Sequence, residues 1–509
     1  MKESRTKNSF KNFQFGAITQ VINTIFSFIS RTIFIKVLGE EYLGVNGLFT
    51  NILTVLSFAE LGIGNAIIFS MYKPIAENNK DKINALMKLY KKAYNIIGIV
   101  VLLIGICVVP FLDFIIKDPP NIHENIEMVY LLYLLNTSLS YFFTYKKSII
   151  SAQQKEYIIN TYKIIFIIIK NILQALFLFI TKNFIVYLCI QILCTFLENL
   201  FVSMRANKMY AYINNKNDSE LVSEEKKDIF KNIKSLVVYK FGSVILNGTD
   251  SIIISKLVGI VEVGLYSNYL LIVQSIGNVI NNALHGITAS IGNLNATADG
   301  KQKEKVFYNL FFISIWIFGF CSIALLTLID PFIEIWLGEG YSLEFSAVVA
   351  IILHFYINGV QFTGYTYRVT AGLFNKGKIA PIVAAILNII LSIWLGNIWG
   401  ITGIILATSI SRLTTTTWYD VFLVHKYEFK TSWIKYLKKY IYYFVIVIIN
   451  YIICSWLVNL LGTGIVNFII KCTIVLVISN LFFLLIFFRK EEFKNILELL
   501  KRIGRRNNT

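Results

Sequence analysis

The chain has 509 residues, of which 56% are hydrophobic and 15% are charged, and its formal net charge is +18. With a mean hydropathy of +0.63, this composition is typical of a membrane protein and excludes an ordinary soluble domain. Apolar segments of about twenty residues, the length of a membrane-crossing helix, follow one another from Phe13 to Phe488. The short polar breaks between them leave no room for a soluble domain larger than a loop.

This alternation predicts an all-α polytopic membrane protein with about fourteen transmembrane helices, each near the length of a tilted span. We place the spans at roughly residues 13–38, 43–70, 93–112, 127–145, 157–181, 184–204, 236–258, 263–291, 306–329, 345–367, 379–396, 401–424, 440–461 and 465–488. The basic tail before the first span lacks a small-residue cleavage site. We therefore interpret that span as retained and not as a signal peptide.

The distribution of basic residues predicts the direction of each crossing. With the N-terminus in the cytoplasm, most of the 48 lysines and arginines fall in the tails and inner connections. The outer connections then hold only Lys36, Lys117, Lys182 and Lys256. By the positive-inside rule, both termini are cytoplasmic. The net charge is thus a topology signal with anionic membrane lipids as its partner, and no nucleic acid is expected.

Two stretches of the sequence repeat one another, FIKVLGEEYLGVNGLF at 34–49 and IISKLVGIVEVGLY at 253–266. One shift of 220 residues aligns Lys36 with Lys256, Gly39 with Gly259 and Gly44 with Gly264. We interpret the stretches as the outer turns after spans 1 and 7, and spans 1–6 and 7–12 as two copies of one six-helix unit. An even number of spans per copy gives both copies the same orientation, about a pseudo-twofold axis along the membrane normal.

The repeat predicts the domain organisation. The expected parts are an N-terminal six-helix lobe (1–205), a cytoplasmic linker (206–235), a C-terminal six-helix lobe (236–425), an additional helix pair (426–488) and a basic cytoplasmic tail (489–509). Two such lobes suggest a central cavity that opens alternately to the two sides of the membrane. Transport by alternating access is therefore the leading hypothesis.

Ionisable side chains within a span cost roughly 2.5–3.5 kcal/mol on insertion scales, and they usually face a cavity or a partner. Arg31 in span 1 and Asp250 in span 7 lie at matching depths, because position 250 corresponds to position 30 after the shift. We predict that Arg31 binds an anionic substrate, and that Asp250 is a partner in the other lobe that releases when substrate enters. A permanent ion pair that only fixes the helices is the alternative.

Four more charged residues are candidates for the same cavity. Lys163 and Lys170 in span 5 share a helix face; we expect Lys170 to line the cavity, while Lys163 either lines it or reaches the inner surface. Arg412 in span 12, followed by four threonines, would add a cationic, hydroxyl-lined wall unless it serves only interhelical hydrogen bonds. Glu60 in FAELGIGNAI would neutralise a cavity arginine, bind a coupling cation or be a buried structural acid.

The two repeated outer turns contain lysines and glycines for which we predict a separate role. We expect Lys36 and Lys256 to face phosphates of the outer leaflet. We expect the glycines of the repeat to let the turns bend as the lobes part: Gly39, Gly44, Gly259 and Gly264. Ordinary turn geometry is the alternative for the glycines.

Sequence motifs of catalysis are missing. There is no GxxxxGK[ST], HExxH or GxSxG stretch and no cysteine and histidine cluster, and the six cysteines lack CxxC spacing. We therefore expect no enzyme activity, no cofactor and no metal site. An ion gradient, the membrane potential or the substrate gradient would supply the energy for transport.

Three stretches carry a family resemblance: IFIKVLGEEYLGVNGLFTNILTVLSFAELGIGNAI, SMYKPIAENNKDKINALMKLYKKAY and NGTDSIIISKLVGIVEVGLYSNYLLI. On these residues the chain resembles, over essentially its whole length, the Wzx-like polysaccharide flippases (O-antigen or capsule type). They belong to the MOP superfamily with the lipid II flippases and the MATE antiporters. The resemblance implies that an undecaprenyl-diphosphate-linked oligosaccharide is moved across the bacterial cytoplasmic membrane for polysaccharide export. It also suggests a cationic lumen, to which we assign Arg31, Lys170 and Arg412 by placement, and a groove for the lipid tail at spans 13 and 14.

A MATE-like cation-coupled multidrug antiporter is the alternative function. Such a carrier would present acids to its substrate, whereas basic residues prevail within these spans. A scaffold for cell-envelope assembly is a third possibility, but it would need no charges within the spans. Polysaccharide polymerase or assembly proteins are further expected partners.

Overall fold

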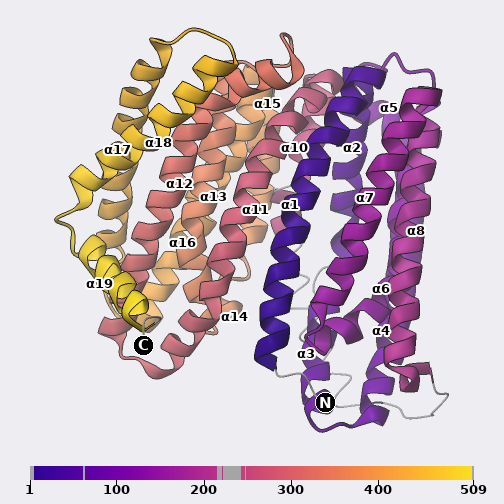
Figure 1. The fold of residues 1–509 in the computed structure, drawn as a ribbon, viewed down its shortest axis with the longest axis horizontal. Coiled ribbons are helices and arrows are strands. Elements are labelled where there is room, and N and C mark those ends of the chain that lie inside the picture. Colours follow the sequence, from indigo (N-terminus) through magenta and orange to yellow (C-terminus); the bar gives the residue numbers. More distant parts are fainter. Residues whose placement is uncertain (1–4, 61–62, 215–220, 222–241, 247, 507–509) are drawn as a thin grey trace. The chain divides into compact units, whose positions relative to one another are not determined.

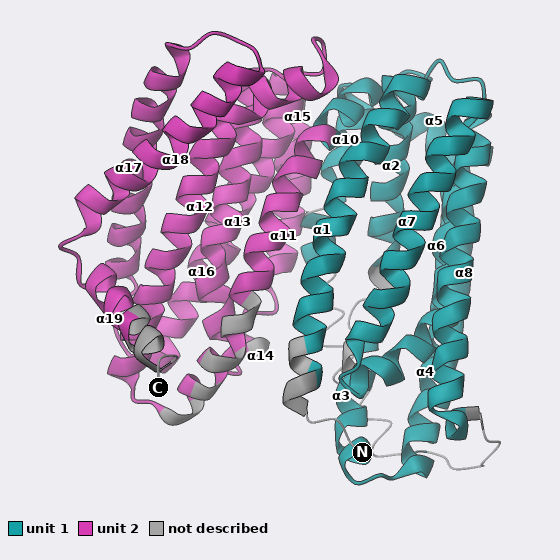
Figure 2. Ribbon diagram, viewed as in Figure 1, with its two compact units in different colours: residues 1–267 teal, residues 268–509 magenta. Residues whose placement is uncertain are grey.

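The structure is a computed structural model that describes residues 5–60, 63–214, 221, 242–246 and 248–506. Within this part of the chain every regular element is a helix, as predicted (Figure 1). Among the described residues, eleven helices are long and apolar enough to cross a membrane by their length and composition. The chain forms two compact units, residues 1–267 and 268–509 (Figure 2).

Unit 1 is a bundle of long helices with shorter ones at its ends. The elements are α1 (Arg5–Leu38), α2 (Glu40–Leu56), η1 (Ser57–Glu60), α3 (Ile63–Ala76), α4 (Lys80–Val108), η2 (Val109–Phe111), α5 (Leu112–Ile115), α6 (Ile126–Ala152), α7 (Glu156–Thr181), α8 (Phe184–Met209), η3 (Ala211–Asn214), α10 (Asp250–Leu257) and the start of α11 (Ile260–Thr297). α1 packs on α7, and α6 packs on α4 and α8. Aromatic side chains fill this core, with Phe49 against Tyr130 and Phe34 against Phe184.

Unit 2 contains the rest of α11 and the helices that follow it. These are α12 (Gly300–Leu337), α13 (Phe345–Thr370), α14 (Phe374–Gly377), α15 (Ala380–Thr414), α16 (Thr416–Val424), a π-helical turn η4 (His425–Phe429), α17 (Ile434–Asn459), α18 (Ile465–Phe487) and α19 (Glu491–Arg506). α12 lies at the centre, because it packs on α13, α17, α18 and α19. The predicted additional pair, α17 and α18, thus shares the core of unit 2.

α15 consists of two antiparallel helices. Trp399 and Gly400 leave the helical conformation, and Gly400 has φ 54°. Asn388 Nδ2 donates to Thr408 Oγ1 at 2.8 Å across the two halves. A side chain at Gly403 would overlap the carbonyl group of Leu395, so only glycine allows the halves to approach this closely. The turn falls between the predicted spans 379–396 and 401–424.

Some predicted loops are helical. The segment from Lys80 to Lys92 was expected as an inner connection, but it forms the first turns of α4, capped by Asn79. The segment 301–305 likewise belongs to α12, capped by Asp299. These helices extend beyond the predicted spans because hydropathy marks only the part of a helix within the bilayer, whereas lysine and glutamate are good helix formers in water.

Two predicted spans are interrupted. In the span placed at 43–70, α2 ends at Leu56, and the Ser57 hydroxyl bonds back to the Leu53 carbonyl at 2.7 Å. Such local bonds compete with the helical ladder. In the span placed at 401–424, Thr415 separates α15 from α16. The expected total of fourteen spans stays a prediction, because span 236–258 and the linker 206–235 fall partly outside the described residues.

Candidate functional site

Arg31 lies in the spanning helix α1 of unit 1. Its Nη1 donates a hydrogen bond to Ser267 Oγ on α11 at 2.6 Å. Tyr133 on α6 and Tyr187 on α8 lie within electrostatic range of the guanidinium. A guanidinium offers five N–H donors in a planar fork. The site is therefore suited to an anion that can accept several hydrogen bonds.

Asp250, the predicted partner of Arg31, is the first residue of α10 and is buried. Its electrostatic neighbour is Tyr266 on α11, the residue before Ser267. Arg31 and Asp250 thus lie near consecutive positions of α11 within unit 1. A direct interaction between the two stays a prediction.

Lys170 lies in a cluster of mixed charge. Glu198 and Cys194 on α8 and Lys163 on α7 are its electrostatic neighbours. Glu198 forms an ion pair with Lys147 on α6 at 3.4 Å. Lys163 is exposed. The structure therefore places Lys170 near an acid that already has a basic partner.

Glu60 lies at the break that follows α2. The Tyr94 hydroxyl donates to Glu60 Oε1 at 2.9 Å, and the Tyr90 hydroxyl lies 3.4 Å from that of Tyr94. Tyr141 on α6 is a third tyrosine beside the carboxylate. A Cβ on Gly64 would come within 2.9 Å of two of these hydroxyls, so the glycine makes room for them. The acid is thus held by hydroxyl groups at an interruption of a spanning helix.

Arg412 belongs to a buried polar network in unit 2. Its Nη1 donates to Gln361 Oε1 on α13 at 3.2 Å. Gln361 is also hydrogen-bonded to Asp420 on α16. Asp420 in turn forms an ion pair with Arg368 Nε at 2.6 Å, and the two side chains are only 4% and 2% exposed. The network connects α13, α15 and α16 on both sides of the break at Thr415.

Sequence reasoning missed Arg368 and Asp420. Arg368 was counted among the inner loop residues, but it belongs to the last turn of α13. Asp420 stands alone in an apolar stretch of span 12. An isolated acid within a span is itself the signal that should have identified it.

The four threonines after Arg412 divide into two pairs. Thr414 and Thr415 donate to carbonyl groups of their own helix, those of Ile410 and Ser411. Thr416 and Thr417 are buried, and their hydroxyls have no hydrogen-bond partner in the structure. The hydroxyl-lined cavity wall stays a prediction.

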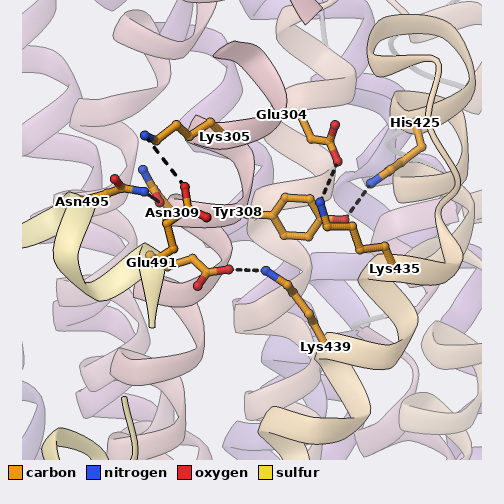
Figure 3. Close-up of polar contacts among 10 residues, drawn as sticks. Glu304, Lys305, Tyr308, Asn309, His425, Lys435, Lys439, Glu491 and Asn495 are labelled. Atoms are coloured by element: carbon orange, nitrogen blue, oxygen red, sulfur yellow. Dashed lines mark hydrogen bonds and ion pairs between the residues drawn. The ribbon is translucent and has the colours of Figure 1, made fainter. Parts of the chain in front are cut away.

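A charged pocket of about 190 Å³ lies in unit 2 between the starts of α12, α17 and α19 (Figure 3). Three ion pairs surround it: Lys435 with Glu304 at 3.4 Å, Lys305 with Glu491 at 4.0 Å, and Lys439 with Glu492. No pattern in the sequence predicts this pocket. Its side chains were assigned to separate loops, and only the packing of α19 on α12 brings them together.

In the charged pocket, Tyr308 lies between the lysines and a buried histidine. Its hydroxyl is 3.2 Å from His425 Nε2 (Figure 3), and the Lys435 and Lys439 ammonium groups lie 4.8 and 4.5 Å from its ring centroid. His425 Nδ1 lies 2.9 Å from the Val421 carbonyl oxygen. The histidine therefore has a partner on each ring nitrogen, as expected for a structural residue.

The repeated outer turns meet within unit 1. Gly39 has φ 95° between α1 and α2, and Gly259 separates α10 from α11. Lys36 is exposed, whereas the Lys256 ammonium lies 4.0 Å from the centroid of the Phe114 ring. The roles of these four residues in gating stay predictions.

The fold is similar to that of solved membrane transporters. The chain aligns with a solved lipid II flippase, MurJ in an inward closed conformation, at 18% identity, with a TM-score of 0.62 over 92% of this chain and 98% of that one. It also aligns with an inward-facing multidrug resistance MATE family transporter, at 14% identity and a TM-score of 0.58 over 78% and 93%. The bent form of the Vibrio cholerae MATE transporter VcmN has 13% identity and a TM-score of 0.56 over 84% and 98%. The chain thus has the fold of the MOP superfamily of multi-pass membrane transporters.

The family is shown by sequence. The family described as polysaccharide biosynthesis protein matches residues 9–291, more than half of the chain, and the chain belongs to this family. Among curated proteins, no relative matches.

Proposed function

We propose that the protein translocates an undecaprenyl-diphosphate-linked oligosaccharide across the bacterial cytoplasmic membrane by alternating access. The observation that carries this proposal is Arg31, a cation within a spanning helix that donates a hydrogen bond to the Ser267 hydroxyl. A diphosphate can accept several N–H donors from one guanidinium, as bidentate recognition of phosphate requires. Membership of a polysaccharide biosynthesis family supports a saccharide cargo.

The charge balance within the spans supports an anionic substrate over a cationic one. Asp420 is paired with Arg368, and Glu198 is paired with Lys147. Glu60 accepts a hydrogen bond from Tyr94. A MATE-like antiporter for cationic drugs, the second candidate, needs an acid that its substrate can reach. The fold alone supports that candidate, because solved MATE transporters align with the chain.

Several finer assignments belong to this proposal. Arg31 makes the first contact with the diphosphate, and Lys170 and Arg412 are further anion contacts within their own units. Both termini lie in the cytoplasm, as the basic residues predict. Polysaccharide polymerase or assembly proteins receive the product at the outer side of the membrane.

The test compares flipping by wild type, Arg31→Lys and Arg31→Ala. The full chain is reconstituted in proteoliposomes with a fluorescent undecaprenyl-diphosphate-linked saccharide, and its transfer between leaflets is followed with a membrane-impermeant quencher. We expect loss of transfer in Arg31→Ala and partial retention in Arg31→Lys, because a lysine keeps the charge but not the planar fork. Arg205→Ala, at an exposed position of α8, is the matched control.

Two outcomes would contradict the proposal. One is unchanged transfer in a well-folded Arg31→Ala. The other is no transfer by wild type, together with proton- or sodium-driven uptake of a cationic dye. The second result would favour the antiporter.

A further inference from the structure

A groove of about 420 Å³ lies on unit 2 where α15 and α16 meet. We call it the α15–α16 groove. Its lining comprises Ile379, Ala380, Val383, Thr414, Thr415, Trp418, Tyr419, Phe422 and Trp433. The break at Thr415 ends one helix and starts the next at this point. No residue of the lining is charged.

The groove belongs to a surface that faces hydrocarbon. From residue 379 to residue 394, the exposed side chains are all large and apolar: Ile379, Val383, Ile386, Ile390, Ile393 and Trp394. In a helix that spans a bilayer, such an apolar stripe lies against lipid tails, because an aqueous cavity would favour polar side chains. Ile379 and Val383 of this stripe form one wall of the groove, so the groove is open to the lipid phase.

Four exposed lysines lie in the chain segments next to the groove, 376–378 before Ile379 and 426–430 after Phe422. They are Lys376, Lys378, Lys426 and Lys430. The Tyr419 hydroxyl donates to the Lys376 carbonyl at 3.1 Å, and the Lys426 ammonium lies 5.4 Å from the centroid of the Phe422 ring. Tyr419 and Phe422 both line the groove, so the lysines adjoin its rim.

Glu428, the acidic residue between Lys426 and Lys430, does not neutralise these lysines. Glu428 is directed to Lys303 of α12, with which it forms an ion pair at 3.1 Å. The rim therefore keeps a net positive charge. A lysine cluster at the end of a membrane span has the phosphates of anionic lipids as its natural counter-charge.

We propose that the α15–α16 groove is a binding site for one anionic phospholipid, with an acyl chain in the aromatic groove and the phosphate at the lysine rim. With both termini in the cytoplasm, this lipid belongs to the cytoplasmic leaflet. The chemistry favours a lipid over a protein helix. Helices associate in membranes through small residues that let backbones approach, whereas this groove is lined by two tryptophans, a tyrosine and a phenylalanine. The proposal is independent of the translocated substrate.

Trp418 and Trp433 allow a direct test. Full-length protein is reconstituted with phosphatidylglycerol or phosphatidylcholine that carries brominated acyl chains, which quench tryptophan fluorescence on contact. Single Trp→Phe variants give the contribution of each tryptophan. We expect Trp418 and Trp433 to be quenched more strongly by brominated phosphatidylglycerol. Trp394 and Trp456, which are 61% and 64% exposed outside the groove, should respond equally to both lipids.

The headgroup contact is tested by removing charge from the rim. We expect Lys376→Gln with Lys426→Gln to weaken the preference for phosphatidylglycerol roughly tenfold or more, as judged by titration of the brominated lipid into phosphatidylcholine. Lys92→Gln with Lys208→Gln removes the same charge from exposed positions of α4 and α8 and should leave the preference unchanged. Size-exclusion profiles and thermal melting show that each variant is folded.

Three results would overturn the proposal. Equal quenching of Trp418 and Trp433 by the two lipids means that the groove does not select a headgroup. An unchanged preference in the lysine variant means that the rim does not bind the phosphate. Relief of quenching by undecaprenyl phosphate at lower concentration than by unlabelled phosphatidylglycerol means that the groove holds a prenyl lipid instead.

Discussion

Gly44 and Gly264 lie directly against each other in the structure. A Cβ atom on Gly264 would come within 3.1 Å of the Gly44 nitrogen and 3.0 Å of the Glu40 carbonyl oxygen, and a Cβ on Gly44 would overlap the carbonyl of Ile260. The contact is reciprocal, because the same shift of 220 residues relates Glu40 to Ile260 and Gly44 to Gly264. The repeated sequence at 34–49 and 253–266 therefore specifies a close approach of two helices, α2 and α11.

The first prediction concerns this contact. Gly44→Ala should lower the free energy of unfolding by roughly 1–3 kcal/mol, because the added methyl group meets backbone atoms that cannot rotate away. Thermal melting of the purified protein measures the change. Gly16→Ala in α1 is the control, since its Cβ would meet only Asn160 Nδ2 at 4.0 Å. Equal melting temperatures of the Gly44 variant and wild type would contradict this prediction. They would show that α2 and α11 can move apart without loss of stability.

The second prediction concerns the Arg368 and Asp420 ion pair. Asp420→Asn should destabilise unit 2 by roughly 3–5 kcal/mol, because it leaves a buried guanidinium without its counter-charge. Arg368→Met combined with Asp420→Leu should recover most of that loss, since an apolar pair of similar volume requires no desolvation. The two variants are compared by thermal melting.

The control for the ion pair is Glu77→Gln, which removes the exposed partner of Lys73 at 3.9 Å. Its expected cost is about 0–1 kcal/mol. If Asp420→Asn melts like this control, the pair contributes no more than a surface ion pair. If the double variant melts at a lower temperature than Asp420→Asn, the polar groups of Arg368 and Asp420 stabilise the network beyond their mutual ion pair.

The third prediction concerns attachment of α19. Glu492 is only 10% exposed and pairs with Lys439, whereas Glu491 is 80% exposed and lies 4.0 Å from Lys305. Phe493 of α19 also stacks on Trp316 at 5.9 Å. Glu492→Gln should therefore lower the free energy of local unfolding of α19 by about 1 kcal/mol. Tryptic cleavage at Lys494 and Lys501 should then be several-fold faster. Glu491→Gln should have little effect, and equal cleavage of the two variants would contradict a role for the buried pair.

The fourth prediction concerns the helical hairpin of α15. Asn388→Ala should cost on the order of 1 kcal/mol, the usual scale for an interhelical hydrogen bond in a membrane, because it removes the donor to Thr408. Asn397→Ala is the matched control, since Asn397 is exposed and bonds only to the Ile393 carbonyl of its own helix. If Asn397→Ala loses more stability than Asn388→Ala, the stabilising contact lies near the turn at Trp399 and Gly400 and not at the Asn388–Thr408 hydrogen bond.

Much of the fold could be predicted from the sequence. Hydropathy located the spans because each side chain in a bilayer is selected by its local environment, with little dependence on its neighbours in space. Helix breaks were harder to predict. The interruptions near Glu60 and at Thr415 lie inside continuous apolar stretches, where hydropathy does not change.

The candidate site was predicted less completely. Arg31 and Glu60 were identified because a charge within a span is costly wherever it lies, but their neighbours Ser267 and Tyr94 are uncharged and gave no such signal. Arg368 and Asp420 became a pair only through packing of α13 on α16. The pocket of Figure 3 likewise required α19 to dock on α12.

The sequence by itself determined that this protein is an all-helical membrane protein with more basic than acidic charge within its spans, and it predicted two related copies of a helical unit. These properties follow from composition, periodicity and repetition along the chain. Only the tertiary structure decided which of those charges are paired, where glycine brings two backbones into contact, and where an aromatic groove opens beside a lysine rim. Pairing and grooves depend on distances between helices far apart in the chain, which no local pattern of residues encodes.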